Sequence, residues 1–310
     1  MPDQSQQQLF DQAAPTAPPD RVVGSELGVR PARVIAPPAP GLRRVRAVIA
    51  YDGGAFHGFA PNDGIATVTG TLNATLARIV QTEIAVVGAG RTDAGVHARA
   101  QVISFDAPSV IDLARLQRSV NSMCAPSLVV RDIAWAADDF NARFSARWRH
   151  YRYAVLNAPW PDPLIANRSW HVRAPLDVLS MQLACDPFVG THDFTSFCRQ
   201  PKVSAAQRST RPPRSMVRRI IDAHWDRPND DGVLMFHITA NAFCHQMVRA
   251  IVGFLVEVGQ GERHAGEVLA VLRAKDRSWA GIVAPAQGLT LWHVGYDDEH
   301  DLGSSTRHLR

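Results

Sequence analysis

The sequence predicts an α+β protein built from two pseudo-repeated halves. Short segments that alternate apolar and polar residues, as half-buried strands do, are interleaved with segments of helical periodicity. The order of strands and helices in residues 41–146 returns in residues 147–296. The chain has 310 residues, of which 46% are hydrophobic, and this suffices for one large or two medium domains with a real core.

The first half opens with a predicted strand over 43–51 that ends at the turn residues Asp52, Gly53 and Gly54. A helix follows, because Leu72, Leu76 and Ile79 recur at helical spacing. Segments 84–87 and 100–105 are predicted strands on either side of a glycine-rich loop. A helix over 109–123 and a strand over 128–135 complete this half.

The second half repeats this alternation of strands and helices. The segments 149–156, 216–225, 233–239 and 289–296 are predicted strands, and 176–183, 242–258 and 265–275 are predicted helices. Both halves mix antiparallel strands with helices, and the boundary is expected near residues 144–149.

Polar segments flank the two halves. Residues 1–40 contain eight of the 21 prolines and no sustained apolar period, which predicts a disordered N-terminal tail. Residues 297–310 are predicted to form a second polar tail. No stretch approaches the roughly 18 apolar residues of a membrane helix. Four widely spaced cysteines form no C-x-x-C pair, and this favours reduced thiols in a cytoplasmic protein.

The basic residues are nearly all arginine. Lys202 and Lys275 are the only lysines among 33 Lys and Arg, which leaves 31 arginines. Arginine suits phosphate because its planar fork donates two parallel hydrogen bonds, although a compositional bias of the genome explains the ratio equally well. The net charge of +4 permits a nucleic-acid partner without requiring one.

The loop that begins Gly88-Ala89-Gly90 follows an apolar strand, as in dinucleotide-binding oxidoreductases. That fingerprint needs another small residue three positions after the second glycine. Asp93 occupies the position, and its carboxylate would repel a pyrophosphate. The loop instead lets Arg91 and Asp93 project from a tight turn, either as a reactive pair or as a structural turn in which Arg91 pairs with Asp93.

The full string Gly88-Ala89-Gly90-Arg91-Thr92-Asp93-Ala94-Gly95-Val96-His97-Ala98 resembles the signature loop of the tRNA pseudouridine synthase A family. Further stretches similar to this family are 51–53, 140–146, 149–153, 190–197, 243–253 and 284–291. The chain departs from the family at Gly58-Phe59-Ala60, where Gly-Trp-Gln is usual, and in a longer loop over 199–215.

The resemblance implies specific roles for residues in both halves. Asp93 would be the catalytic nucleophile, Tyr151 would stack on the flipped base and could remove its C5 proton, and Arg249 would orient Asp93. Substrate contacts are expected from Arg91, Thr92, Leu289, Arg143 and Arg152. Further RNA contacts are expected among Arg147, Arg149, Arg208, Arg211, Arg214, Arg218 and Arg219, some of which belong to a solvated surface.

The chemistry of a buried arginine supports a role for Arg249 independently of the family resemblance. It lies within the apolar helix predicted over 242–258, and a buried guanidinium needs an anion. The family implies that this anion is Asp93, whereas the alternative is a structural pair with another acid. His97 and the pair His192-Asp193 are interpreted as structural hydrogen-bonding groups, because no second set of metal ligands accompanies them.

The resemblance also implies a fold and an activity. The fold would be two ferredoxin-like (RRM-like) halves whose antiparallel sheets merge, with a central cleft above Asp93. The activity would be isomerisation of uridine to pseudouridine at tRNA positions 38, 39 and 40, in the anticodon stem-loop. The enzyme would be a cytoplasmic homodimer without cofactor or metal. A catalytically silent RNA-binding protein is the alternative, motivated by the altered Gly58-Phe59-Ala60.

Overall fold

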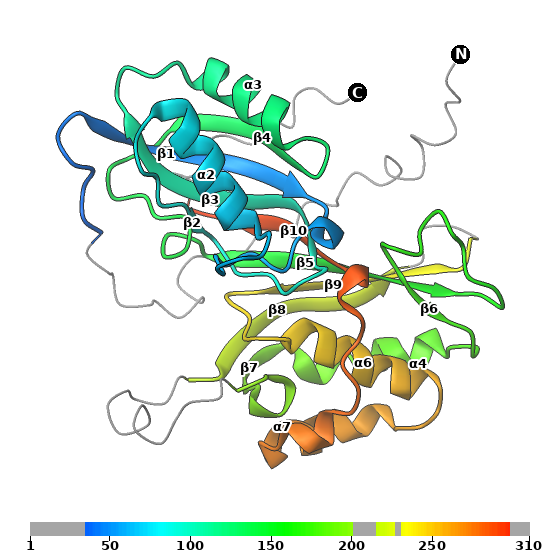
Figure 1. The fold of residues 1–310 in the computed structure, drawn as a ribbon. Coiled ribbons are helices and arrows are strands. Elements are labelled where there is room, and N and C mark those ends of the chain that lie inside the picture. The colour runs from blue at the N-terminus through cyan, green and yellow to red at the C-terminus, as the bar shows by residue number, and fades with distance from the viewer. Residues whose placement is uncertain (1–34, 201–214, 227–230, 298–310) are drawn as a thin grey trace.

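The computed structural model describes residues 35–200, 215–226 and 231–297. Most of the two predicted tails and of the long loop lies outside these ranges, namely residues 1–34, 298–310 and 201–214, which include Arg208, Arg211 and Arg214. The described chain forms one large sheet with helices packed against it (Figure 1). The predicted α+β class is confirmed.

The first half contains four strands and two helices in the order βαββαβ. Its elements are β1 (Leu42–Tyr51), α2 (Val68–Val80), β2 (Val87–Gly88), β3 (His97–Pro108), α3 (Leu113–Cys124) and β4 (Leu128–Trp135). In space the strands are ordered β4-β1-β3-β2, and each adjacent pair is antiparallel. Asp112 caps α3 by accepting hydrogen bonds from the backbone of Ala114 and Arg115, so this helix begins later than predicted.

The second half repeats this strand order with additions. Its elements are β5 (Trp148–Asn157), β6 (Trp170–Val172), α4 (Val178–Leu183), β7 (Gly190–Asp193), β8 (Val217–Asp226), β9 (Val233–Ala240), α6 (Met247–Gly259), α7 (Val268–Ala274) and β10 (Leu289–Gly295). The strands are ordered β10-β5-β9-β8, which matches β4-β1-β3-β2 position by position. This equivalence confirms the pseudo-repeat. The boundary predicted at residues 146 and 147 remains a prediction.

The two halves are joined through β10. It pairs with β5 in the antiparallel direction and with β3 in the parallel direction, where Thr290 and Leu291 face His97 and Ala98. Figure 1 shows β10, drawn in red, between β3 and β5. The sheets therefore merge as predicted, but their junction is parallel. β2 and β10 share the same edge of β3, so the loop between β2 and β3 leaves the sheet where the halves meet.

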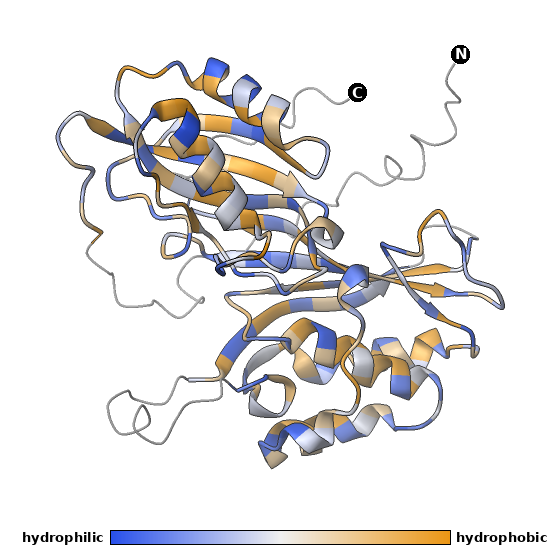
Figure 2. Ribbon diagram, viewed as in Figure 1, coloured by the Kyte–Doolittle hydropathy of each residue, from blue (hydrophilic) through white to orange (hydrophobic). Residues whose placement is uncertain are grey.

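Hydrophobic side chains of both halves form one continuous core. Hydrophobic and hydrophilic residues alternate along the strands, as Figure 2 shows, because neighbouring residues of a strand point to opposite faces. In β5 the buried residues Tyr151, Tyr153 and Val155 share one face. The helix α6 is almost entirely buried, and its sequence is apolar apart from Arg249 and Glu257.

The predicted helix over 242–258 differs from the structure at its start. Gln246 adopts a left-handed conformation, with φ of 63°, and α6 begins at Met247. Residues 242–244 therefore have no regular structure, and His245 and Gln246 form a turn that leads into the helix. This difference matters for the site, because His245 lies in that turn.

The opposite face of β5 carries a histidine stack, which comprises His150, His237 and His224. The ring of His237 lies 5.4 Å from that of His150 and 4.8 Å from that of His224. Arg152 lies on this face beside the stack and covers the ring of Trp292 at 3.8 Å. Arg152 is therefore on the other side of the sheet from Tyr151.

Candidate active site

The loop between β2 and β3 is anchored from several sides. The hydroxyls of Thr92 and Tyr51 are 2.9 Å apart and both side chains are buried. The backbone N–H of Phe59 donates to the carbonyl of Thr92 at 3.1 Å. Gly95 has φ of 79°, a conformation that favours glycine, and it returns the chain to β3. These contacts fix the backbone on both sides of Asp93.

The carboxylate of Asp93 lies between two nitrogen donors from the second half. Nη1 of Arg249 donates to Oδ2 at 2.9 Å, and Nε2 of His245 is 3.2 Å from Oδ1. Nε of Arg249 donates to the carbonyl of Ala284 at 2.8 Å, which fixes the guanidinium. The side chain of Asp93 is 24% exposed and that of Arg249 is 15% exposed. The structure thus brings together the two residues that the sequence placed in different halves.

Tyr151 approaches the same loop from β5. A Cβ placed on Gly90 would lie 3.8 Å from the Tyr151 hydroxyl, so the loop passes close to the end of this side chain. The ring also meets Phe243 edge to face, with centroids 5.0 Å apart. Burial raises the pKa of Tyr151 to about 12, and the charge of Asp93 adds to the shift while Arg149 opposes it. The phenol is therefore protonated at neutral pH.

Leu289 lies on the same face as Tyr151. It is the first residue of β10, is paired with Tyr153, and is 6% exposed. The next residue on its face is Leu291, which is paired with Tyr151. Leu289 and Tyr151 thus belong to one apolar surface beside the Asp93 loop.

Arg149 does not lie on an RNA-facing surface, and its prediction as an RNA contact is wrong. Arg149 is buried and only 5% exposed. Its guanidinium donates to four backbone carbonyls, those of Ala89, Arg143, Ala146 and Asn241. A buried arginine satisfied in this way holds segments together. Here it ties the Asp93 loop to β5 and to the segment before α6.

The other predicted arginines occupy different places. Arg91 and Arg143 are exposed, and Arg143 covers the ring of Phe144 at 5.7 Å. Arg147 forms an ion pair with Asp297. Burial and the charge of Arg99 lower the pKa of Arg152 to about 10. The structure does not bring Arg152 to the Asp93 loop, because Arg152 lies on the opposite face of β5.

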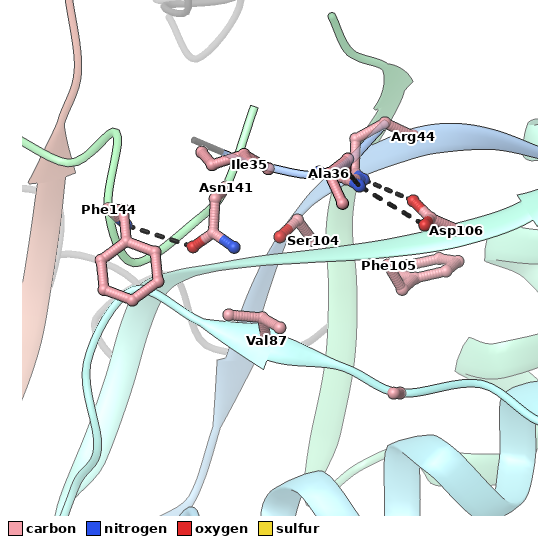
Figure 3. Close-up of a pocket in the computed structure, with 10 residues that line it drawn as sticks. Ile35, Ala36, Arg44, Val87, Ser104, Phe105, Asp106, Asn141 and Phe144 are labelled. Atoms are coloured by element: carbon pink, nitrogen blue, oxygen red, sulfur yellow. Dashed lines mark hydrogen bonds and ion pairs between the residues drawn. The ribbon is translucent and has the colours of Figure 1, made fainter. Parts of the chain in front are cut away.

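Two cavities lie away from the site formed by Asp93, Tyr151 and Arg249. One, of about 470 Å³, is lined by residues that include Val87, Ser104, Asn141 and Phe144 (Figure 3). Arg44 at its wall is already paired with Asp106, as Figure 3 shows. The other, of about 770 Å³, is lined by residues that include Gln246 at the start of α6. Neither cavity is lined by Asp93, Tyr151 or Arg249.

His97 is a structural residue, as its sequence position suggested. Its Nδ1 accepts from the backbone N–H of Gly53 at 3.0 Å, and its Nε2 lies 3.1 Å from the carbonyl of Asn167. A ring that accepts at Nδ1 and donates at Nε2 is neutral. Burial lowers its pKa, although the charge of Asp52 opposes this. His97 therefore anchors the start of β3 and has a structural role, not a reactive one.

Sequence reasoning missed His245. The signal was present as the spacing His-x-x-x-Arg between His245 and Arg249. Such a spacing places two side chains on one face of a helix. The spacing alone did not identify His245, because His245 lies in the turn before α6 and not within the helix.

The cysteines also differ from expectation. Cys198 and Cys244 are joined as a disulfide, with Cα atoms 5.8 Å apart, so the prediction of four reduced thiols is wrong for this pair. Cys124 and Cys185 are free. Within the described ranges, no group of three or more His, Cys, Asp or Glu residues is arranged to hold a metal ion. No helix in the described part of the chain is long and apolar enough to cross a membrane.

Comparison with known proteins links this arrangement to one family. A family model described as tRNA pseudouridine synthase matches residues 184–297. The curated "tRNA pseudouridine synthase A" of Brevibacillus brevis is 42% identical over 255 residues, which are 82% of this chain and 100% of the relative. The Geobacillus kaustophilus protein of that name is 40% identical over 83% of this chain and 96% of the relative. The Bacillus subtilis protein of that name is 38% identical over 82% of this chain and 100% of the relative.

Proposed function

This chain belongs to the tRNA pseudouridine synthase A family, and on that premise we propose that it modifies uridines 38, 39 and 40 in the anticodon stem-loop of tRNA, with Asp93 as nucleophile. As a member of the family it is a tRNA pseudouridine synthase and hence an isomerase. The finer proposal concerns which uridines react and which residues carry the reaction.

One observation carries the proposal for the nucleophile: the contact between Asp93 and Arg249. A guanidinium at 2.9 Å stabilises the carboxylate's charge and fixes its direction. Asp93 comes from the signature loop of the first half, and Arg249 comes from α6 of the second half. An ion pair that joins the halves beside a buried tyrosine fits a reactive group better than a structural turn.

The reaction needs no oxidant, reductant or external group. The bond between C1′ of the ribose and N1 of uracil breaks, and a bond between C1′ and C5 forms. The C5 proton is lost, and N1 gains a proton. A carboxylate serves this exchange either by attacking the nucleotide covalently or by stabilising the positive charge of the sugar while the base turns. Both routes require an oriented, ionised Asp93.

Tyr151 and Leu289 supply the surface on which the base is held. The target uridine must leave its helical stack, and stacking on an aromatic ring offsets part of that cost. Because burial raises the pKa of Tyr151 to about 12, its phenol form favours stacking over proton abstraction in the free enzyme. Leu289 extends the same apolar surface.

The exposed arginines of the first half are the proposed RNA contacts. Arg91 lies beside Asp93 in the loop, and Arg143 precedes β5; both are exposed. Such residues bind phosphates and set position rather than sequence. Thr92 supports the loop through its bond to Tyr51. Arg152 is not among the proposed RNA contacts. It lies on the other face of β5, where it contacts Trp292.

The assembly and location follow the family expectation. We propose a cytoplasmic homodimer in which each site binds one tRNA. Light scattering of the purified protein measures the mass directly, and a monomer at working concentrations would contradict the dimer.

Pseudouridine mapping tests the function. The purified protein is incubated with unmodified tRNA, and products are located at single-nucleotide resolution. Native protein should modify positions 38, 39 and 40, Asp93→Asn should make no product, and the exposed-residue control Asp138→Asn should match the native protein. Product formation by Asp93→Asn would remove Asp93 as nucleophile. Binding of tRNA by native protein without any product would support the catalytically silent alternative.

A further inference from the structure

The two oxygens of Asp93 are held by different side chains. Oδ2 receives a hydrogen bond from Arg249 at 2.9 Å, and Oδ1 lies 3.2 Å from Nε2 of His245. The contact between Nε2 and Oδ1 is within ion-pair distance. A carboxylate only accepts hydrogen bonds, so this contact is favourable when Nε2 of His245 carries a proton.

The backbone around His245 directs its side chain toward Asp93. The carbonyl of His245 accepts from the backbone N–H of Arg199 at 2.9 Å. Gln246, in the left-handed region with φ of 63°, then turns the chain into α6. Cys244 is tied to Cys198 on the other side of His245. His245 therefore stands on an anchored segment, and its contact with Asp93 is preorganised.

The side chains of Arg249, Asp93 and His245 differ in their exposure to solvent. The side chain of Arg249 is 15% exposed, that of Asp93 is 24% exposed, and that of His245 is 48% exposed. Arg249 thus holds Asp93 from the protein interior, whereas His245 holds it from the solvent side.

One donor on one oxygen leaves a carboxylate free to rotate about its Cβ–Cγ bond, whereas donors on both oxygens fix its plane. A small rotation of a nucleophile changes its angle of attack, and such misalignment lowers the rate of a positioned reaction. The two contacts together therefore define the plane of the Asp93 carboxylate before RNA binds.

We propose that His245 is a positioning residue for the reaction, which fixes Oδ1 of Asp93 through its Nε2–H. This inference rests on the proposed function of Asp93 as nucleophile. The role needs a donor at the place of Nε2 and does not need a histidine as such. It acts through Asp93 and not through direct contact with RNA, so it should affect turnover more than tRNA binding.

Two substitutions separate the donor from the ring. His245→Phe keeps a ring of similar size but has no donor, and His245→Gln places an amide N–H near the position of Nε2. His245→Phe should lower kcat about tenfold, since a hydrogen bond to a charged group is lost at a half-exposed site. KM and the Kd for tRNA should stay within about twofold. His245→Gln should recover most of kcat, and the exposed control His264→Phe should keep the native kcat.

Steady-state and single-turnover kinetics on tRNA, with thermal unfolding of every variant, decide the outcome. Unchanged kcat in His245→Phe would overturn the proposal, as would His245→Gln that is folded and as slow as His245→Phe. A loss confined to KM would overturn it in favour of an RNA contact. Failure of the proposed function looks different, since native protein would then make no pseudouridine or Asp93→Asn would remain active.

Discussion

Lowering the pH from about 8 to about 5 should destabilise this protein through the histidine stack on the outer face of β5. His237 is 9% exposed. Burial, followed by the charge of Arg152, lowers the pKa of His237 to about 3. The same two causes, in the same order, lower the pKa of His150 to about 4. Both rings are therefore neutral in the folded protein at any pH above these values.

The direction follows from proton binding. An unfolded histidine titrates near pH 6.5, so below that pH the unfolded chain binds protons that the folded chain does not. Stability is complete above pH 6.5 and falls with pH down to the folded pKa. At about pH 5 each of the two histidines costs about 2 kcal/mol, or about 4 kcal/mol together. His224, whose pKa is raised by its hydrogen bond to Asp222, acts in the opposite direction.

Urea unfolding at about pH 8 and about pH 5 measures the effect, because carboxylates remain largely ionised at both values. The informative quantity is the change in unfolding free energy between the two pH values. His237→Asn should reduce that change by about 2 kcal/mol relative to native protein. The matched control His57→Asn, at an exposed histidine, should leave it unaltered.

Comparison within each protein removes any effect of the substitution on stability at high pH. If His237→Asn loses as much stability as native protein between the two pH values, the ring of His237 is not kept neutral by burial and the reasoning is refuted. A stronger loss in the variant would refute it equally.

Three further predictions concern the site and its support. Arg249→Met should lower the single-turnover rate by about 100-fold or more while tRNA binding in a filter assay is retained; weaker binding with a native rate would contradict the proposed orienting role. Tyr151→Phe keeps the stacking ring and should stay within about tenfold of the native kcat, whereas Tyr151→Ala should lose at least about 100-fold; equal losses would assign the hydroxyl the main role. Gly53→Ala would place a methyl group into the carbonyl of Val96 and should cost about 1–3 kcal/mol in urea unfolding, whereas Gly266→Ala, which has open space, should cost less than about 1 kcal/mol.

Sequence reasoning predicted the elements best where periodicity is local. β1, β4, β5 and β9 lie within one or two residues of their predicted bounds, because their alternating patterns are complete within each strand. The predicted strand over 84–87 is reduced to Val87–Gly88. The reason is non-local, since the backbone N–H of Val86 donates to the side chain of Asn73 in α2 at 3.0 Å.

The candidate site was predicted in part. The ion pair between Asp93 and Arg249 was expected from the family resemblance and from the cost of burying a lone guanidinium, and the structure contains it. The face on which Arg152 lies follows from strand alternation once Tyr151 is assigned to the site, but Arg152 was predicted as a substrate contact beside the catalytic Tyr151. Arg149 could not be placed from sequence, because its four carbonyl partners lie in three separate segments.

The position of β10 has a consequence for biosynthesis. Residues 289–295 leave the ribosome after Asp93, Tyr151 and Arg249, yet this strand is the only element that pairs with both β3 and β5 within the described ranges. A nascent chain thus carries every proposed reactive side chain before β10 can join its two halves. Translation that stops short of residue 289 should release a polypeptide that holds the full set of reactive groups and no assembled catalyst.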